Sequence, residues 1–229
     1  MGDWTNIEGQ DGAFRAYVAR PSGQSKGTVV LAQEIFGVNA VMRGKADWLA
    51  SEGFWALAPD LFWRLEKDVD ITDQSEAEWA KAMGLMKRFN VDAGVRDMSA
   101  TIAAARGWGA KKVGVMGYCL GGLVAYLCAC RTDCDASVAY HGGGIHMHLD
   151  EGKSIKKPLL MHNAAKDAFI PASAQDAISA AFAGNPLVTI YTYADVDHAF
   201  TREGGAHYHH PSKQLADGRT IAFLTQNLA

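Results

Sequence analysis

Short runs of apolar and β-branched residues alternate along the chain with longer stretches in which apolar residues recur every three or four positions. The short, nearly continuous runs are typical of strands that are buried on both faces of a parallel sheet. The longer periodic stretches predict helices that bury one face against that sheet. The predicted strands are residues 14–19, 28–33, 54–58, 112–116, 136–140, 158–162 and 188–193. The predicted helices are residues 39–51, 74–89, 92–106, 120–131, 172–183 and 213–226.

Regular alternation of strands and helices predicts an α/β fold with a mostly parallel, doubly wound sheet flanked by helices. Pro171 at the start of one predicted helix and Gly184 after its last apolar residue mark the ends of that helix. The sequence has no internal repeat, and no insertion is long enough to form a separate lid. We therefore expect one domain, residues 1–229.

Composition narrows the classes of partner. Hydrophobic residues make up 48% of the 229 positions and charged residues 21%, which suits a protein with a substantial core. The net charge of −3 offers no electrostatic reason to bind nucleic acid. No apolar stretch has the length of a membrane span, and the amino terminus lacks a signal-peptide core. We expect a cytoplasmic protein, a monomer or small homo-oligomer, that acts on a small molecule without a membrane or nucleic-acid partner.

Two groups of residues superficially resemble metal sites. Three of the four cysteines, Cys128, Cys130 and Cys134, fall on one apolar stretch without a paired C-x-x-C knuckle, so we expect them to be reduced core residues. The loop histidines have no acidic or cysteine partner at ligand spacing, and we expect them to be solvated. They are His146, His148, His207, His209 and His210. No metal and no cofactor is predicted.

The run "KVGVMGYCLGG", residues 112–122, places the fourth cysteine, Cys119, between a predicted strand and a predicted helix. Gly117-Tyr118-Cys119-Leu120-Gly121 is a G-x-C-x-G form of the nucleophile elbow, in which small neighbours permit a sharp turn. The positive end of the following helix favours the thiolate. The first amide of that helix, from Leu120, can donate to an oxyanion. The alternative is a glycine-rich turn with an incidental core cysteine.

Two further residues complete a nucleophile–acid–histidine order. Asp167 follows the predicted strand 158–162, and His198 follows the predicted strand 188–193. Because ligands bind beyond the carboxyl ends of such strands, both side chains are expected at the same sheet edge as Cys119. His198 would take the thiol proton and later activate water, while Asp167 would orient the imidazole. The segment "HGGG" at 141–144 follows the nucleophile, unlike the lipase oxyanion motif, and we expect a flexible loop there.

Five motifs together resemble the dienelactone hydrolases, or carboxymethylenebutenolidases. They are "AQEIFGVNAVMRG" (32–44), "APDLF" (58–62), "GYCLGG" (117–122), "DAFIP" (167–171) and "DHAFTR" (197–202), which span almost the whole chain. The resemblance implies an α/β-hydrolase fold without a large cap domain and a Cys–His–Asp triad. It also implies hydrolysis of a carboxylated enol lactone, dienelactone, to maleylacetate in the bacterial breakdown of chloroaromatic compounds.

The same resemblance assigns roles residue by residue. It implies Cys119 as nucleophile, Asp167 as acid, His198 as base, and Glu34 as an active-site carboxylate. We expect that Glu34, if it faces Cys119, opposes thiolate formation until substrate displaces it. The remaining implied residues are the backbone amides of Ile35 and Leu120 in the oxyanion hole, Arg202 as a clamp on the substrate carboxylate, and Tyr140 and Phe36 in the pocket wall.

One departure from the family weakens the choice of substrate. The family has a second substrate-binding arginine in the region that matches residues 73–85, and "DQSEAEWAKAMGL" contains none. Lys81 is the nearest cation, with Arg64 and Arg88 outside the segment. A lysine ammonium cannot bind both oxygens of a carboxylate as a planar guanidinium does. Either another residue completes the site or the substrate differs. A broad carboxylesterase or thioesterase therefore stays open, as does a non-catalytic α/β-hydrolase-like binding protein.

Overall fold

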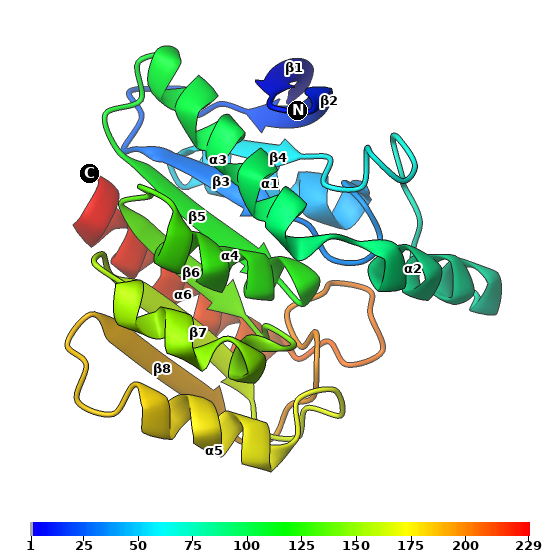
Figure 1. Ribbon diagram of the computed structural model, residues 1–229, viewed down its shortest axis with the longest axis vertical. Coiled ribbons are helices and arrows are strands. Elements are labelled where there is room, and N and C mark those ends of the chain that lie inside the picture. The colour runs from blue at the N-terminus through cyan, green and yellow to red at the C-terminus, as the bar shows by residue number, and fades with distance from the viewer. Residues whose placement is uncertain (1) are drawn as a thin grey trace.

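Eight strands form a single sheet in the computed structural model, which describes residues 2–229 (Figure 1). The order across the sheet is β1-β2-β4-β3-β5-β6-β7-β8. The hairpin β1–β2 and the pair β2–β4 are antiparallel, and every other neighbouring pair is parallel. The strands are β1 (Asp3–Gly9), β2 (Gly12–Ala19), β3 (Thr28–Ala32), β4 (Trp55–Pro59), β5 (Val113–Tyr118), β6 (Ala136–Tyr140), β7 (Leu159–Ala164) and β8 (Val188–Tyr193).

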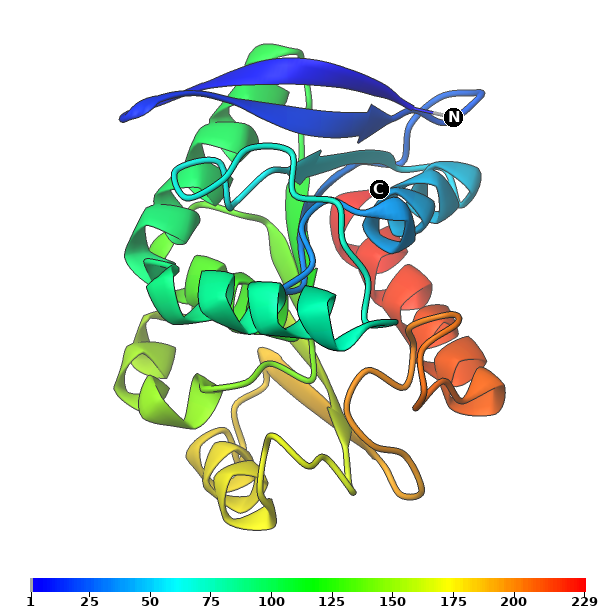
Figure 2. The same cartoon turned by 90° about the vertical axis from the view of Figure 1, so that its right-hand side faces the viewer.

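Helices cover both faces of this sheet. Figure 2 shows α3, α4 and α5 on one side and α1 and α6 on the other, while α2 crosses the edge that faces the viewer. The helices are α1 (Ala40–Ser51), α2 (Glu76–Arg88), α3 (Val91–Gly107), α4 (Leu120–Arg131), α5 (Ala172–Ala181) and α6 (His210–Leu228). The predicted doubly wound α/β fold is confirmed, and residues 2–229 contain no inserted cap domain. None of the helices described here has the length and apolar content needed to span a membrane.

Local sequence explains where these elements begin. Strands β3, β5, β6 and β7 are buried at every position, as their continuous apolar runs predict. Asn39 and Asn90 cap α1 and α3 by accepting a hydrogen bond from a backbone N–H in the first turn. Ser75 caps α2 in the same way, and its hydroxyl also donates to Glu78 three residues later.

Two regions differ from the sequence predictions. Strand β1 was not predicted, because only Ile7 among its residues is buried and the strand pairs on one side at the sheet's edge. The segment at residues 141–144, expected to be a flexible loop, is closely packed at its start, where His141 and Gly142 are buried. A Cβ at Gly142 would lie 2.8 Å from the Gly122 carbonyl carbon, so this turn packs tightly against the start of α4. Two short 3₁₀ helices, Ile145–Met147 and Leu149–Ser154, follow it.

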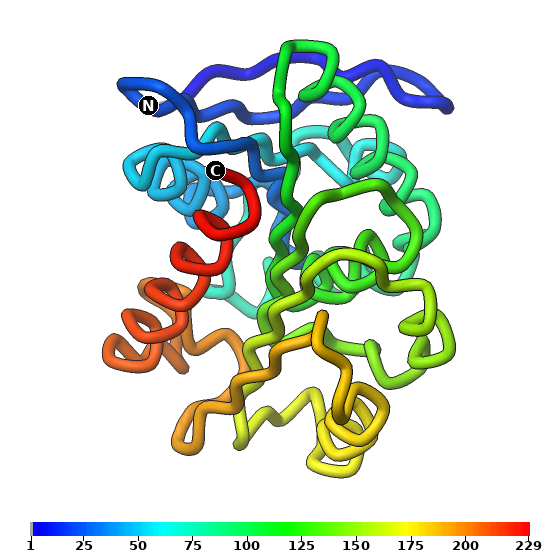
Figure 3. Tube along the Cα trace, turned by 90° about the vertical axis from the view of Figure 1, so that its left-hand side faces the viewer, coloured from blue at the N-terminus to red at the C-terminus, as the bar shows by residue number. Residues whose placement is uncertain are grey.

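The sheet has a topological switch point between β3 and β5. These strands are neighbours, yet the connection after β3 leads outward to β4 while the chain after β5 turns toward β6 and β7. Open α/β sheets bind ligands in the crevice that such a reversal leaves at the carboxyl ends of the strands. Figure 3 shows the molecule from the opposite side, where α6 ends at the C-terminus. Leu228, near the end of α6, packs against Gly27.

Candidate active site

Cys119 occupies a strained turn between β5 and α4. Its φ of 56° and ψ of −116° lie in a region that non-glycine residues rarely adopt. A Cβ at Gly121 would lie 2.3 Å from the carbonyl oxygen of Ala32, and one at Gly117 would lie 2.0 Å from that of Gly121. Glycine at both positions lets α4 approach the end of β3, and the thiol is left partly exposed at the sheet edge. This is the strand–turn–helix geometry of a nucleophile elbow.

Asp167 and His198 form a buried pair in two neighbouring loops. Nδ1 of His198 lies 2.8 Å from Oδ2 of Asp167. The other oxygen of Asp167 accepts hydrogen bonds from the backbone N–H groups of Phe169 and Ile170, at 2.9 and 3.0 Å. These donors hold the carboxylate in place, and it in turn fixes the plane of the imidazole.

The protonated form of His198 is stabilised. Burial lowers the pKa of His198, but the hydrogen bond to Asp167 and the nearby Cys119 sulfur outweigh it and raise the pKa to about 10. Nε2 of His198, the nitrogen that does not contact Asp167, has no hydrogen-bond partner among residues 2–229. Catalytic hydrogen bonds are often loose before substrate binds. The structure thus brings Cys119, His198 and Asp167 to one place.

Two backbone amides are free at the elbow. Neither the N–H of Ile35, after β3, nor that of Leu120, at the first position of α4, donates a hydrogen bond within residues 2–229. Both residues belong to one apolar cluster that Cys119 contacts. Unpaired amides beside a nucleophile can receive the oxyanion of a tetrahedral intermediate.

Glu34 and Arg202 form a buried, bidentate ion pair. Nε and Nη2 of Arg202 donate to the two carboxylate oxygens of Glu34 at 2.9 and 2.7 Å. Nη1 of the same guanidinium donates to Asp73 at 2.8 Å. Burial lowers the pKa of Arg202, but the two carboxylates outweigh it and raise the pKa above its usual range. Glu34 therefore directs both oxygens at Arg202 rather than at Cys119.

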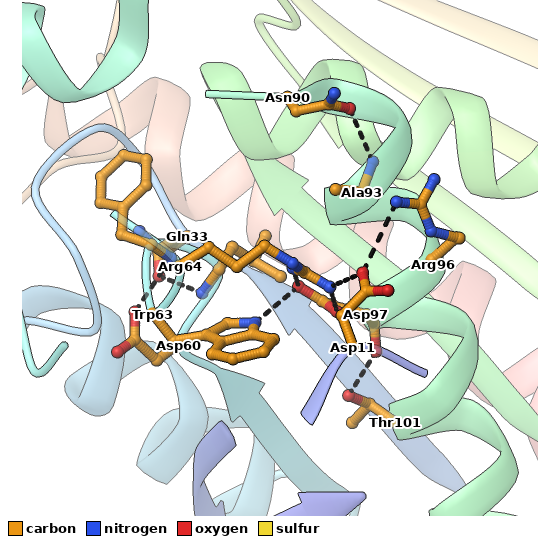
Figure 4. A network of polar contacts seen from close by, with 12 residues as sticks. Asp11, Gln33, Asp60, Trp63, Arg64, Asn90, Ala93, Arg96, Asp97 and Thr101 are labelled. Atoms are coloured by element: carbon orange, nitrogen blue, oxygen red, sulfur yellow. Dashed lines mark hydrogen bonds and ion pairs between the residues drawn. The ribbon is translucent and has the colours of Figure 1, made fainter. Parts of the chain in front are cut away.

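The other candidate cations lie elsewhere. Lys81 was expected near the substrate, but its ammonium pairs with Glu66 at 2.6 Å and both side chains are exposed, so this expectation is wrong. Arg64, in the connection between β4 and α2, donates to Asp97 and to Asp11, the latter at 2.7 Å (Figure 4). The Nε of Arg88 donates to a backbone carbonyl in its own helix.

The two aromatic residues implied for the pocket wall are both core residues. The hydroxyl of Tyr140 bonds to Thr220 at 2.6 Å and to Asp217 at 3.2 Å beneath α6, so its side chain does not line the pocket. Its carbonyl accepts from the N–H of Cys119 instead. Phe36 is buried, and its ring centroid lies 4.9 Å from Cζ of Arg202. The ring therefore packs against the guanidinium.

A cleft of about 420 Å³ opens beside His198. Phe169, whose side chain is 61% exposed, forms part of the wall and meets the His198 ring edge-on at 5.0 Å. The remaining wall comes from the segment that leads into α2, from α2 itself, and from the loops after β7 and β8. Its residues are Asp73, Gln74, Trp79, Ala168, Ala199, Arg202, Gly204, Gly205, Ala206 and His207.

Three residues of the site were missed from sequence. Asp197 accepts from the N–H groups of Ala168 and His198, at 2.8 and 2.6 Å, and so ties the loops of Asp167 and His198 together. Its position beside His198 in "DHAF" was the only available signal. Lys45 is buried and donates to the carbonyl of Thr201 at 3.0 Å, which fixes the loop that carries Arg202.

His141 is the third missed residue. It is fully buried with a φ of 36°, and its ring centroid lies 4.5 Å from that of His198. Burial, followed by the charges of His198, Arg202 and Lys45, lowers the pKa of His141 well below its usual value. A neutral ring therefore packs against the imidazole of His198. Sequence gave no reason to separate His141 from the other loop histidines.

The loop histidines and the other cysteines do not gather around a common centre. His148 contacts Glu151, and His207 contacts Asp197, both at 3.1 Å. Cys128 and Cys134 are buried, and all four cysteines are free. Within residues 2–229 no group of three or more histidine, cysteine, aspartate or glutamate side chains has the geometry to hold a metal ion.

Comparison with known proteins gives one consistent family. The family model for dienelactone hydrolases matches residues 14–228. The carboxymethylenebutenolidase of Pseudomonas putida is 36% identical over 96% of this chain and 94% of its own length. A protein of Azospirillum brasilense, 47% identical over the full length of both chains, carries a provisional form of the same name. The crystal structure of a provisionally named dienelactone hydrolase from Klebsiella pneumoniae superposes with a TM-score of 0.87 at 27% identity, covering 99% of this chain and 98% of that one.

Proposed function

The chain belongs to the dienelactone hydrolase family, whose members act on carboxylic esters, and from this premise we propose that it opens a carboxylated enol lactone through a thioester at Cys119. One observation carries the proposal. The buried pair of His198 and Asp167, joined at 2.8 Å, lies beside a strained cysteine at the amino end of a helix. A packed core cysteine has no need of a strained backbone or of a charged imidazole beside it.

The reaction begins from the ion pair in which His198 holds the proton of the Cys119 thiol. The thiolate attacks the lactone carbonyl, and the oxyanion that forms is held by the N–H groups of Ile35 and Leu120. The ring C–O bond breaks, and the departing enolate takes the proton from His198. The neutral imidazole then removes a proton from water, the hydroxide attacks the thioester, and the thiolate leaves. The product is the opened acid, whose enol tautomerises to the ketone.

A sulfur nucleophile restricts which substrates can react. Thiolate is itself a good leaving group, so the tetrahedral adduct proceeds only when the departing oxygen is also stabilised. Enol lactones and aryl esters meet this condition, because an enolate or a phenolate departs. Amides and simple alkyl esters fit poorly, and we expect little peptidase activity.

Recognition of the substrate carboxylate is assigned to Arg202. It is the one lysine or arginine among the residues described for the cleft wall, and carboxymethylenebutenolidases act on lactones that carry a carboxylate. A planar guanidinium can bind such a group with two parallel hydrogen bonds. A second candidate function is a hydrolase of neutral esters or thioesters. The engagement of Arg202 by both Glu34 and Asp73 favours it.

The test compares kcat/KM for dienelactone with that for 4-nitrophenyl acetate, a neutral aryl ester. We expect turnover of both substrates, and loss of both activities in Cys119→Ala. A matched Cys130→Ala variant, changed at a cysteine outside the site, controls for general effects of removing a thiol. Turnover of the aryl ester alone would support the second function. Absence of any turnover would indicate a binding protein and would refute the proposal.

A further inference from the structure

The guanidinium of Arg202 has two edges on which a carboxylate can form paired hydrogen bonds. Glu34 occupies the edge formed by Nε and Nη2 with both of its oxygens. The other edge, formed by Nη1 and Nη2, faces Asp73, whose Oδ2 accepts from Nη1 at 2.8 Å. A substrate carboxylate can bind this second edge with two hydrogen bonds only where Asp73 has moved away.

Asp73 is held in place by its own segment. Nε1 of Trp79 donates to the backbone carbonyl of Asp73 at 3.0 Å, and the side chain of Gln74 donates to its Oδ1 at 2.6 Å. The side chains of Asp73 and Arg202 are each only 11% exposed. Burial raises the pKa of Asp73, but the hydrogen bonds from Arg202 and Gln74 outweigh it and lower the pKa below its usual value. Asp73 is therefore ionised and fixed against Arg202.

The charges around this point do not favour an anion. Glu34 and Asp73 bring two negative charges to the single positive charge of Arg202. Among the residues described for the cleft wall, no second lysine or arginine offsets them. An anionic acyl group that enters this cleft meets a guanidinium whose charge is already balanced by two carboxylates.

We propose that Asp73 determines the charge specificity of the cleft. It occupies the place of a substrate carboxylate on Arg202, so that the cleft in this state selects neutral acyl groups and binds an anionic one only in exchange for Asp73. This inference rests on the proposed hydrolytic function, because it concerns the acyl group that Cys119 receives.

The test uses two activated esters of nearly the same size. Mono-(4-nitrophenyl) glutarate carries a terminal carboxylate, and 4-nitrophenyl pentanoate carries a methyl group there. In Asp73→Asn, which keeps the shape and one acceptor oxygen, we expect the ratio of kcat/KM for glutarate to that for pentanoate to rise about tenfold or more, the change that one charge-assisted hydrogen bond produces. The increase should lie mainly in a lower KM for glutarate.

Asp70→Asn is the matched control. Asp70 lies on the same connecting segment and pairs with Arg43 at 2.8 Å, so the variant removes the same charge from outside the cleft. We expect the ratio in Asp70→Asn to stay close to that of the parent. Repeating the assay in about 0.5 M NaCl removes long-range effects of charge, and the difference between the two variants should persist. Equal ratios in Asp73→Asn and Asp70→Asn would overturn the proposal.

Calorimetry separates this inference from the proposed function. Free glutarate should bind Asp73→Asn at least about tenfold more tightly than it binds the parent, whether or not either ester is hydrolysed. Equal affinities would refute the role of Asp73, whereas absent turnover with unequal affinities would refute only the hydrolytic function. Asp73→Ser serves in both assays where Asp73→Asn does not fold.

Discussion

The folded chain should lose stability in mild acid because of its buried histidines, of which His162 lies outside the active site. Its ring lies in β7, fully buried, with Nδ1 2.9 Å from the hydroxyl of Tyr193 and Nε2 3.0 Å from that of Thr220. One ring nitrogen donates and the other accepts, so the neutral ring is satisfied. Burial, and then the charge of Arg219, lowers the pKa of His162 to about 3.

The size of the effect follows from this pKa. In the unfolded chain the ring titrates near about 6.5, so between that pH and about 3 the unfolded chain binds a proton that the folded chain does not. Stability is therefore fully present above about pH 6.5 and falls by about 1.4 kcal/mol for each pH unit below it. From about pH 6.5 to pH 5 the loss from His162 alone is about 2 kcal/mol, a large part of a typical unfolding free energy of about 5–15 kcal/mol.

Urea unfolding at about pH 8, 6.5 and 5, followed by circular dichroism, measures this loss. Most carboxyl groups titrate below this window, so it isolates the histidines. His162→Gln should lose about 2 kcal/mol less than the parent between pH 6.5 and 5, because it has no ring to protonate. His209→Gln, at an exposed histidine, should lose as much as the parent. An equal loss in His162→Gln and the parent would refute the reasoning.

Three shorter predictions concern the site. Gly121→Ala should lower the unfolding free energy by about 3 kcal/mol, since its Cβ would meet two backbone oxygens. Gly218→Ala, with open space around it in α6, should raise the unfolding free energy by up to about 1 kcal/mol. Thermal unfolding of the two variants compares these effects. Asp197→Ala should lower kcat/KM for an aryl ester about tenfold, because two loop amides lose their acceptor. Asp197→Asn should restore most of this activity, and an activity as low as that of Asp197→Ala would count against a positioning role. Iodoacetamide should label Cys119 before the other cysteines in mass spectra, since burial raises the pKa of Cys128, Cys130 and Cys134; initial labelling at any of these three would contradict it.

Most of the fold could be predicted from the sequence because the spacing of apolar residues follows the positions whose side chains are buried. Strands β3, β5, β6 and β7 are buried on both faces, so their apolar runs were unambiguous. Strand β1 was missed because an edge strand that buries one side chain leaves almost no such pattern. The site residues at strand ends were predictable in the same way, since topology brings Cys119, Asp167 and His198 to one edge.

What the sequence could not predict is how the charges pair. Glu34, Asp73 and Arg202 come from three segments, and no local pattern tells which carboxylate a guanidinium binds. Lys81 was chosen for its position along the chain, but it lies on an exposed face of α2 and pairs with Glu66 instead. Tyr140 was similarly placed by motif, while its hydroxyl turns toward α6.

The wide sequence separation within the site bears on how the enzyme is made. Arg202 and Glu34 are 168 positions apart, and Arg202 and Asp73 are 129 apart. A nascent chain emerging from the ribosome therefore presents Cys119 before Asp167, His198 and Arg202 have been synthesised. Since domains acquire long-range contacts late, the thiol lacks its proposed acid until Asp167 has been synthesised and its proposed base until His198 has been. Prematurely terminated products that end before His198 should therefore be inert as hydrolases.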